Sequence, residues 1–62
     1  MRALSAADRV ALARAKLARE VGVESAARRS GVSPVAIRRA LRTAAELSAV
    51  RQFLALIDAP ST

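Results

Sequence analysis

The amino-acid sequence predicts an all-α fold. Apolar residues make up 53% of the 62 residues, and much of that share is alanine, with one phenylalanine and no tryptophan, tyrosine or histidine. Aliphatic residues recur at the three- and four-residue spacing of a helix, and no run has the alternating pattern of a β-strand. We therefore expect one small domain of four helices over residues 1–59, followed by a tail at 60–62.

The first helix is expected at residues 6–21. Ser5 followed by Asp8 resembles a capping box, and Gly22 is a natural stop. The apolar stripe of this helix consists of Val10, Ala13, Leu17 and Val21. Leu12 falls outside the stripe, and the sequence leaves open whether it contacts a partner or solvent.

A short second helix is expected at residues 24–30. Ala26 and Ala27 are small enough for another helix to approach closely, and Gly31 supplies the left-handed residue that ends the segment. The second helix should therefore pack tightly and turn sharply into the next one.

The third helix, residues 34–42, begins with Ser33 as N-cap and Pro34 at the first helical position. At about 100° per residue the helix has two distinct sides. One side carries Ala36, Ile37, Ala40 and Leu41, and the opposite side carries Val35, Arg38, Arg39 and Arg42. Aliphatic residues would thus anchor a helix that presents three guanidinium groups outward.

A fourth helix is expected at residues 44–57, opened by a possible capping box of Thr43 and Glu46 and ended by Pro60, although it could also continue the third helix without a break. Heptad spacing and a wide apolar arc mark Leu47, Val50, Phe53, Leu54, Leu56 and Ile57. A chain of 62 residues without cysteine buries only about 60% of its surface on folding, so one core cannot cover this arc. We expect the helix to form a homodimer; the alternative is that it caps a monomer.

Positive charge is concentrated in one segment. The net charge is +6, and residues 25–45 hold five arginines and no acidic residue. Such a concentration favours a polyanion as partner, either nucleic acid or an anionic membrane. A solvated basic face is the simpler alternative for the pattern of Arg38, Arg39 and Arg42 taken alone.

Residues 23–42, about a third of the chain, resemble the helix-turn-helix of phage Cro and repressor proteins and of many plasmid regulators. The resemblance rests on a small residue four before the turn glycine, an aliphatic after it and a β-branched residue six after it. Here these positions are Ala27, Gly31, Val32 and Ile37, and Leu41 continues the same apolar side. Ser30 departs from the family pattern, which often has leucine there and so a thicker core.

The resemblance implies roles for the polar residues. Base reading in the major groove is implied for Ser33, Val35, Arg38 and Arg39, since arginine donates two hydrogen bonds to guanine and valine packs on a thymine methyl. Phosphate contacts are expected from Ser25, Arg28, Arg29, Arg42, Lys16 and Arg19. For the last two and for the arginines of the second helix, simple solvation is the alternative.

Catalysis is not expected, because the chain has no histidine or cysteine and its five acidic residues are scattered. The same absences argue against a metal or another cofactor, and no small-molecule ligand is evident. No stretch approaches a membrane span or a signal peptide, so we expect a cytoplasmic protein, and the alanine and arginine content suggests a bacterial source.

The sequence therefore predicts a homodimeric transcriptional regulator, a repressor that binds an inverted-repeat DNA operator. The main alternative is a small protein-interaction module of the antitoxin or adaptor type, which would use the last helix and the basic face. RNA or membrane-surface binding ranks lower, because no aromatic residue accompanies the arginines.

Overall fold

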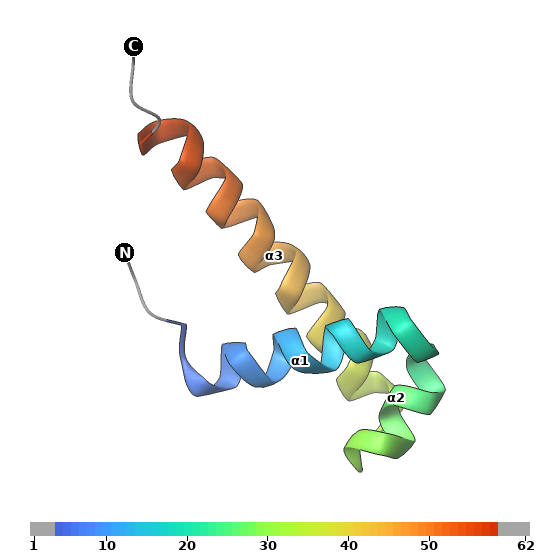
Figure 1. Ribbon diagram of the computed structural model, residues 1–62. Helices are drawn as coiled ribbons and strands as arrows, with labels where there is room; N and C mark the ends of the chain where they lie inside the picture. The colour runs from blue at the N-terminus through green and yellow to red at the C-terminus, as the bar shows by residue number, and fades with distance from the viewer. Residues whose placement is uncertain (1–3, 59–62) are drawn as a thin grey trace.

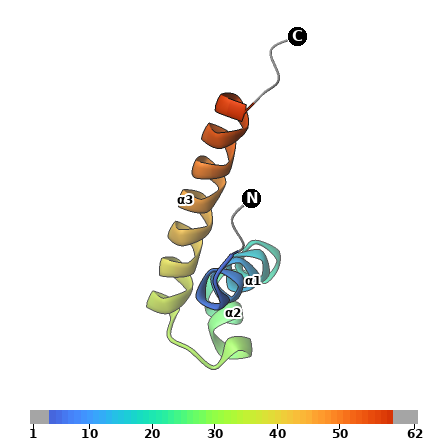
Figure 2. The same ribbon diagram turned by 90° about the vertical axis from the view of Figure 1, so that its left-hand side faces the viewer.

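The computed structural model describes residues 4–58, and α-helix is the regular secondary structure of this part of the chain. It consists of α1 (Ala6–Val21), α2 (Val23–Ser30) and α3 (Pro34–Asp58). The helices α1 and α2 lie against the first half of α3, and the second half of α3 projects away from them (Figures 1 and 2). The molecule is accordingly elongated, with extents of 48 × 20 × 15 Å. The all-α prediction is confirmed.

The limits of α1 follow from local signals at both ends. The Ser5 hydroxyl accepts a hydrogen bond from the Asp8 N–H at 3.1 Å, and the Asp8 carboxylate accepts one from the Ser5 N–H at 3.4 Å. This is the predicted capping box. Gly22 ends the helix with φ 90° and ψ 160°, and its N–H still bonds the Ala18 carbonyl at 2.8 Å.

Gly31 ends α2 with a left-handed backbone, φ 69° and ψ 29°. The Gly31 N–H bonds the Arg28 carbonyl at 3.3 Å, and the Val32 N–H bonds the Ala27 carbonyl at 3.1 Å. This pair of bonds is a Schellman motif, which satisfies carbonyls that the helix leaves free. Helix α2 begins at Val23, one residue before the expected start, and turns through Gly31 toward α3.

Helix α3 begins as predicted, because the Ser33 hydroxyl accepts a hydrogen bond from the Ala36 N–H at 3.3 Å. The expected division into helices at 34–42 and 44–57 is wrong, because α3 is continuous from Pro34 to Asp58. Thr43 therefore lies inside a helix, and the possible capping box of Thr43 and Glu46 does not begin a new helix. Extending a formed helix through its alanine-rich centre requires no new nucleation, whereas a break would need a second nucleus. The predicted tail, 60–62, lies outside the described residues.

The core is built mainly from alanine. Ala18, Ala26 and Ala27 surround Ile37, which has no exposed surface, and partly buried aliphatic residues of all three helices pack against this cluster. Small side chains let helix axes approach closely, so the cluster holds the three helices together with little apolar volume.

The apolar stripe predicted for α1 is only half correct. Leu17 and Val21 pack against the core cluster, but Val10 and Ala13 are exposed. The residues of α1 that are buried most deeply are Ala15 and Ala18. Helix α3 packs on these alanines because they allow a shorter interaxial distance than the bulkier stripe would.

Substituting Gly22 or Gly31 by alanine is expected to destabilise the protein to different extents. A methyl group added at either would meet no atom within 4 Å, so any loss comes from backbone conformation and not from a clash. Gly22 occupies a region that is essentially restricted to glycine, and Gly31 occupies the milder left-handed region. We expect Gly31→Ala to lower the free energy of unfolding by about 1 kcal/mol and Gly22→Ala by about 2–3 kcal/mol. Urea unfolding followed by circular dichroism measures both, and the reverse order would contradict the assignment.

Candidate nucleic-acid interface

The first turns of α3 separate buried aliphatic from exposed basic side chains. Ile37 and Ala40 are buried at 0% and 5% exposure, whereas Val35 on the other side is 60% exposed. The three arginines predicted for this side, Arg38, Arg39 and Arg42, are all exposed. We call the exposed side formed by Val35, Arg38, Arg39 and Arg42 the basic surface. It is convex, and the opposite side of the helix packs against the core.

The segment that precedes α3 holds this helix in place. Ala27 is buried, Val32 and Leu41 pack partly buried against the core cluster, and Ile37 lies within it. Together with the left-handed Gly31 these are the five residues expected to join the two helices.

Ser33 lies at the edge of the basic surface. Its oxygen accepts the capping hydrogen bond from Ala36, and the residue is exposed. A hydroxyl that accepts through one lone pair retains its O–H as a donor. Ser33 can therefore cap α3 and donate to a ligand with the same group.

The outer side of α2 carries a second set of polar groups. Arg28 and Arg29 are exposed and Ser25 is half-buried, opposite the buried Ala26 and Ala27. The Arg28 guanidinium donates to the Ser25 hydroxyl at 3.3 Å. This bond orients one arginine of α2 along the helix surface.

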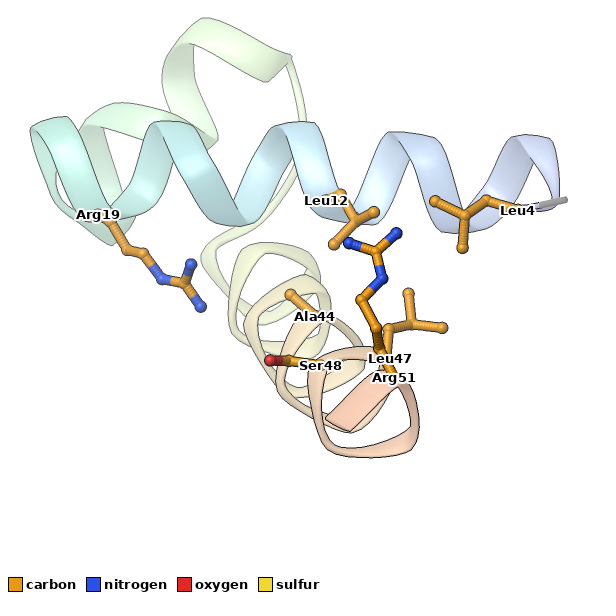
Figure 3. Close-up of a pocket in the computed structure, with 7 residues that line it drawn as sticks. All are labelled: Leu4, Leu12, Arg19, Ala44, Leu47, Ser48 and Arg51. Carbon is orange, nitrogen blue, oxygen red and sulfur yellow. The ribbon is translucent and has the colours of Figure 1, made fainter. Parts of the chain in front are cut away.

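Arg19 is not brought to the basic surface. It lines a hollow of about 260 Å³ together with Leu12 of α1 and with Ala44 and Arg51 of α3 (Figure 3). At about 100° per residue, Ala44 lies half a turn from Val35 around α3, so the hollow is on the side of α3 opposite the basic surface.

Lys16 is exposed on α1. Leu12, whose contacts the sequence left open, is half-buried and lines the hollow beside α3.

Most of the residues predicted for dimerisation are exposed. All ten residues from 48 to 57 are exposed, and within them Leu56 reaches 79% and Phe53 62%. Val50, Leu54 and Ile57 are exposed as well, while Leu47 is half-buried beside α1. The projecting half of α3 thus carries a large apolar surface that α1, α2 and the first half of α3 do not cover.

Sequence reasoning missed a groove of about 550 Å³ between the start of α1 and the first half of α3. Half of the residues that line it are alanines, and a sequence pattern based on bulky aliphatic residues does not detect them. The signal was present as two pairs of alanines four residues apart, Ala7 with Ala11 in α1 and Ala36 with Ala40 in α3.

No side chain among residues 4–57 that carries a charge is buried. The charged groups therefore act from the surface, where salt screens them. Across the described helices, none combines the length and apolar content needed to cross a lipid bilayer.

Comparisons with protein-family models, with curated proteins and with solved structures find no match to this chain.

Proposed function

We propose that this protein is a sequence-specific double-stranded DNA-binding regulator that acts in the cytoplasm. The segment from α2 to the first half of α3 would serve as a helix-turn-helix, with the start of α3 in the major groove. No catalytic chemistry and no cofactor are part of the proposal.

One observation carries it: the exposed side of α3 holds Val35, Arg38, Arg39 and Arg42, with Ile37 fully buried behind them. The major groove of B-DNA admits an α-helix, and its base edges accept hydrogen bonds from arginine. A rigidly held helix with a convex basic side has the shape and the donors for this groove. A merely solvated helix would not require the sharp turn and tight core that fix its orientation.

The residues of the proposed interface fall into two groups, those that contact bases and those that contact phosphates. Arg38 and Arg39 donate to guanine O6 and N7, Val35 packs on a thymine methyl, and Ser33 donates from the edge of the groove. Arg42, Ser25, Arg28 and Arg29 bind backbone phosphates, which sets the register without reading sequence. Arg19 is left out of this set, because it lies with Ala44 and Arg51 on another side of the molecule.

A second copy of the chain completes the proposal. The exposed apolar half of α3 supports a homodimer, and two copies would read an inverted repeat with half-sites one helical turn apart, about 34 Å. Occupation of a promoter by such a dimer represses transcription without a ligand.

Selection of bound sequences from a random duplex pool at about 0.15 M salt tests the function. We expect enrichment of an inverted repeat whose half-sites are about 10 base pairs apart, centre to centre. A pool without enrichment, together with binding that disappears as salt rises, would show that the arginines only neutralise phosphate charge.

The exposed end of α3 also favours a second candidate, an adaptor or antitoxin that binds another protein through residues 47–57. In that case the basic surface would meet an acidic protein surface. Failure of the selection together with a stable monomer would favour this candidate.

A further inference from the structure

Alanine makes up half of the lining of the groove between α1 and α3. Ala6, Ala7 and Ala11 line it from α1 and Ala36 and Ala40 from α3, and the other lining residues are Asp8, Val10, Arg14, Arg39 and Thr43. Methyl groups on both walls leave a volume of about 550 Å³. A trough of this kind accepts large side chains from another element, as a hole accepts a knob in helix packing.

The groove is continuous with the exposed apolar side of α3. At about 100° per residue, Ala36 and Thr43, which line the groove, lie on the same side of α3 as Val50 and Leu54 further along. Arg51 is the charged residue of 48–57, and it points to the hollow beside Leu12 on a different side (Figure 3). One strip along α3 therefore has small side chains at its start and large apolar side chains near its end, and it carries no charge from residue 48 to residue 57.

We propose that the occupant of this groove is the end of α3 from a second copy of the same chain, and that the two copies dock reciprocally and antiparallel. This inference rests on the homodimer of the proposed function and specifies its arrangement. The groove lies at the start of α3 and the large side chains lie at its end, so only antiparallel helices bring one to the other. Parallel helices would set alanine against alanine and leave both grooves empty.

The register follows from matching the strip to itself. With Val50 opposite Leu47 of the partner, Leu54 lies opposite Thr43 and Ile57 opposite Ala40, because each pair sums to the same number in an antiparallel arrangement. Ile57, 60% exposed in the isolated chain, then enters the alanine groove. Val50 and Leu54 cover the remaining contact.

Charge supports the same arrangement. The last turn of α3 contains no basic residue, so no cation of that turn offsets the partial negative charge at this end of the helix dipole. The charged residues that line the groove are Asp8 and Arg14 of α1 and Arg39 of α3, with a net charge of +1. Arg39 is assigned to the DNA, so docking brings the carbonyl end of one α3 close to Arg14 of the other chain.

The arrangement also fixes where the two basic surfaces lie. The middle of the contact falls between Leu47 and Val50, about 10 residues from the middle of the basic surface, or about 15 Å along α3. The two basic surfaces are thus about 30 Å apart along the helix direction. With an interaxial separation of about 8–10 Å at right angles to it, the distance between them is roughly 32 Å. That spacing suits half-sites one DNA turn apart, at about 34 Å.

The two basic surfaces also face the same way. On α3 the basic side, centred near Val35, is about a quarter turn from the strip that carries Leu54. A two-fold axis perpendicular to both helices then leaves each basic side pointing along the axis, toward one duplex. Phe53 and Leu56 lie away from the strip and stay in solvent, so this arrangement reduces the residues expected at the dimer interface to Leu47, Val50, Leu54 and Ile57.

Cysteine cross-linking tests the register directly, since the chain has no cysteine of its own. Chains carrying Leu54→Cys are mixed with tagged chains carrying Thr43→Cys and oxidised, and the products are separated by mass. We expect the disulfide-linked heterodimer of these two variants to dominate. A dominant Leu54→Cys homodimer would place the two positions 54 opposite each other, either in parallel helices or in an antiparallel pair shifted toward the ends of α3. In a second mixture, dominant linkage of Leu54→Cys to Val50→Cys would show an antiparallel register shifted out of the groove. Either result overturns the docking.

A groove-blocking pair of variants provides the second measurement. Ala7→Trp fills the groove from α1, and Ala13→Trp places the same side chain on an exposed site of α1 that does not line it. In sedimentation equilibrium we expect Ala7→Trp to raise the dimer dissociation constant about tenfold or more, with Ala13→Trp unchanged. Equal values for the two variants would overturn the docking. Both experiments omit DNA, so a chain that selects an inverted repeat yet fails them keeps its proposed function and loses only this arrangement.

Discussion

Replacing Ile37 by alanine is expected to unfold most of the protein at room temperature. Ile37 is the largest fully buried side chain and lies inside the cluster that joins all three helices. Removing three carbons from such a site costs about 2–5 kcal/mol, because the cavity cannot collapse fully. A single core in so short a chain rarely supplies more than about 3–5 kcal/mol, so the loss approaches the total.

Helix content by circular dichroism and urea unfolding measure the Ile37→Ala effect. Both should be recorded at several protein concentrations, because dimerisation would add to the apparent stability. Val35→Ala is the matched control, since Val35 stands two residues earlier on the same helix and is 60% exposed. We expect its effect to stay within about 0.5 kcal/mol. A loss below about 1 kcal/mol for Ile37→Ala would contradict the description of the core.

Replacing Arg38 by alanine is expected to weaken binding to the selected operator by about 1–3 kcal/mol, or roughly 5- to 150-fold. Arg38 is exposed and takes no part in the core, so the free energy of unfolding should not change. The preference for one base pair in each half-site should disappear with the arginine. Competition binding against operators substituted at single positions measures both quantities.

Arg51→Ala separates base reading from net charge. It removes the same charge from α3, but Arg51 lies beside Leu12, away from the basic surface. We expect only a small, sequence-independent decrease in affinity from this variant. If Arg38→Ala and Arg51→Ala weaken all duplexes equally, Arg38 does not read a base, even if the protein binds DNA.

Helix ends were predictable because the signals that set them are local. The capping box at Ser5 and Asp8 formed as expected, and so did the left-handed Gly31 and the N-cap at Ser33. Each involves groups within a few residues of one another, so no knowledge of the fold is needed. The possible capping box at Thr43 failed for a related reason, since a cap acts only where the helix is already broken.

Tertiary packing decided which side of α1 is buried. Bulk alone favoured the stripe that includes Val10, yet α3 packs on the alanines of α1 and leaves Val10 exposed. The free energy of helix packing depends on how closely two axes approach, and this depends on both partners at once. The alanine groove arises from the same cause.

By itself the sequence determined the all-α class, most of the helix limits, and the division of α3 into aliphatic and basic sides. These features depend on residues close in sequence or on the fixed angle between successive helical residues. The sequence left open whether residues 34–42 and 44–57 form one helix, and the structure shows that they do. The tertiary structure alone decided that the end of α3 stands clear of α1 and α2. It also decided that a groove lies in line with that end, since only packing between distant segments determines which surfaces a folded chain covers and which it leaves for a partner.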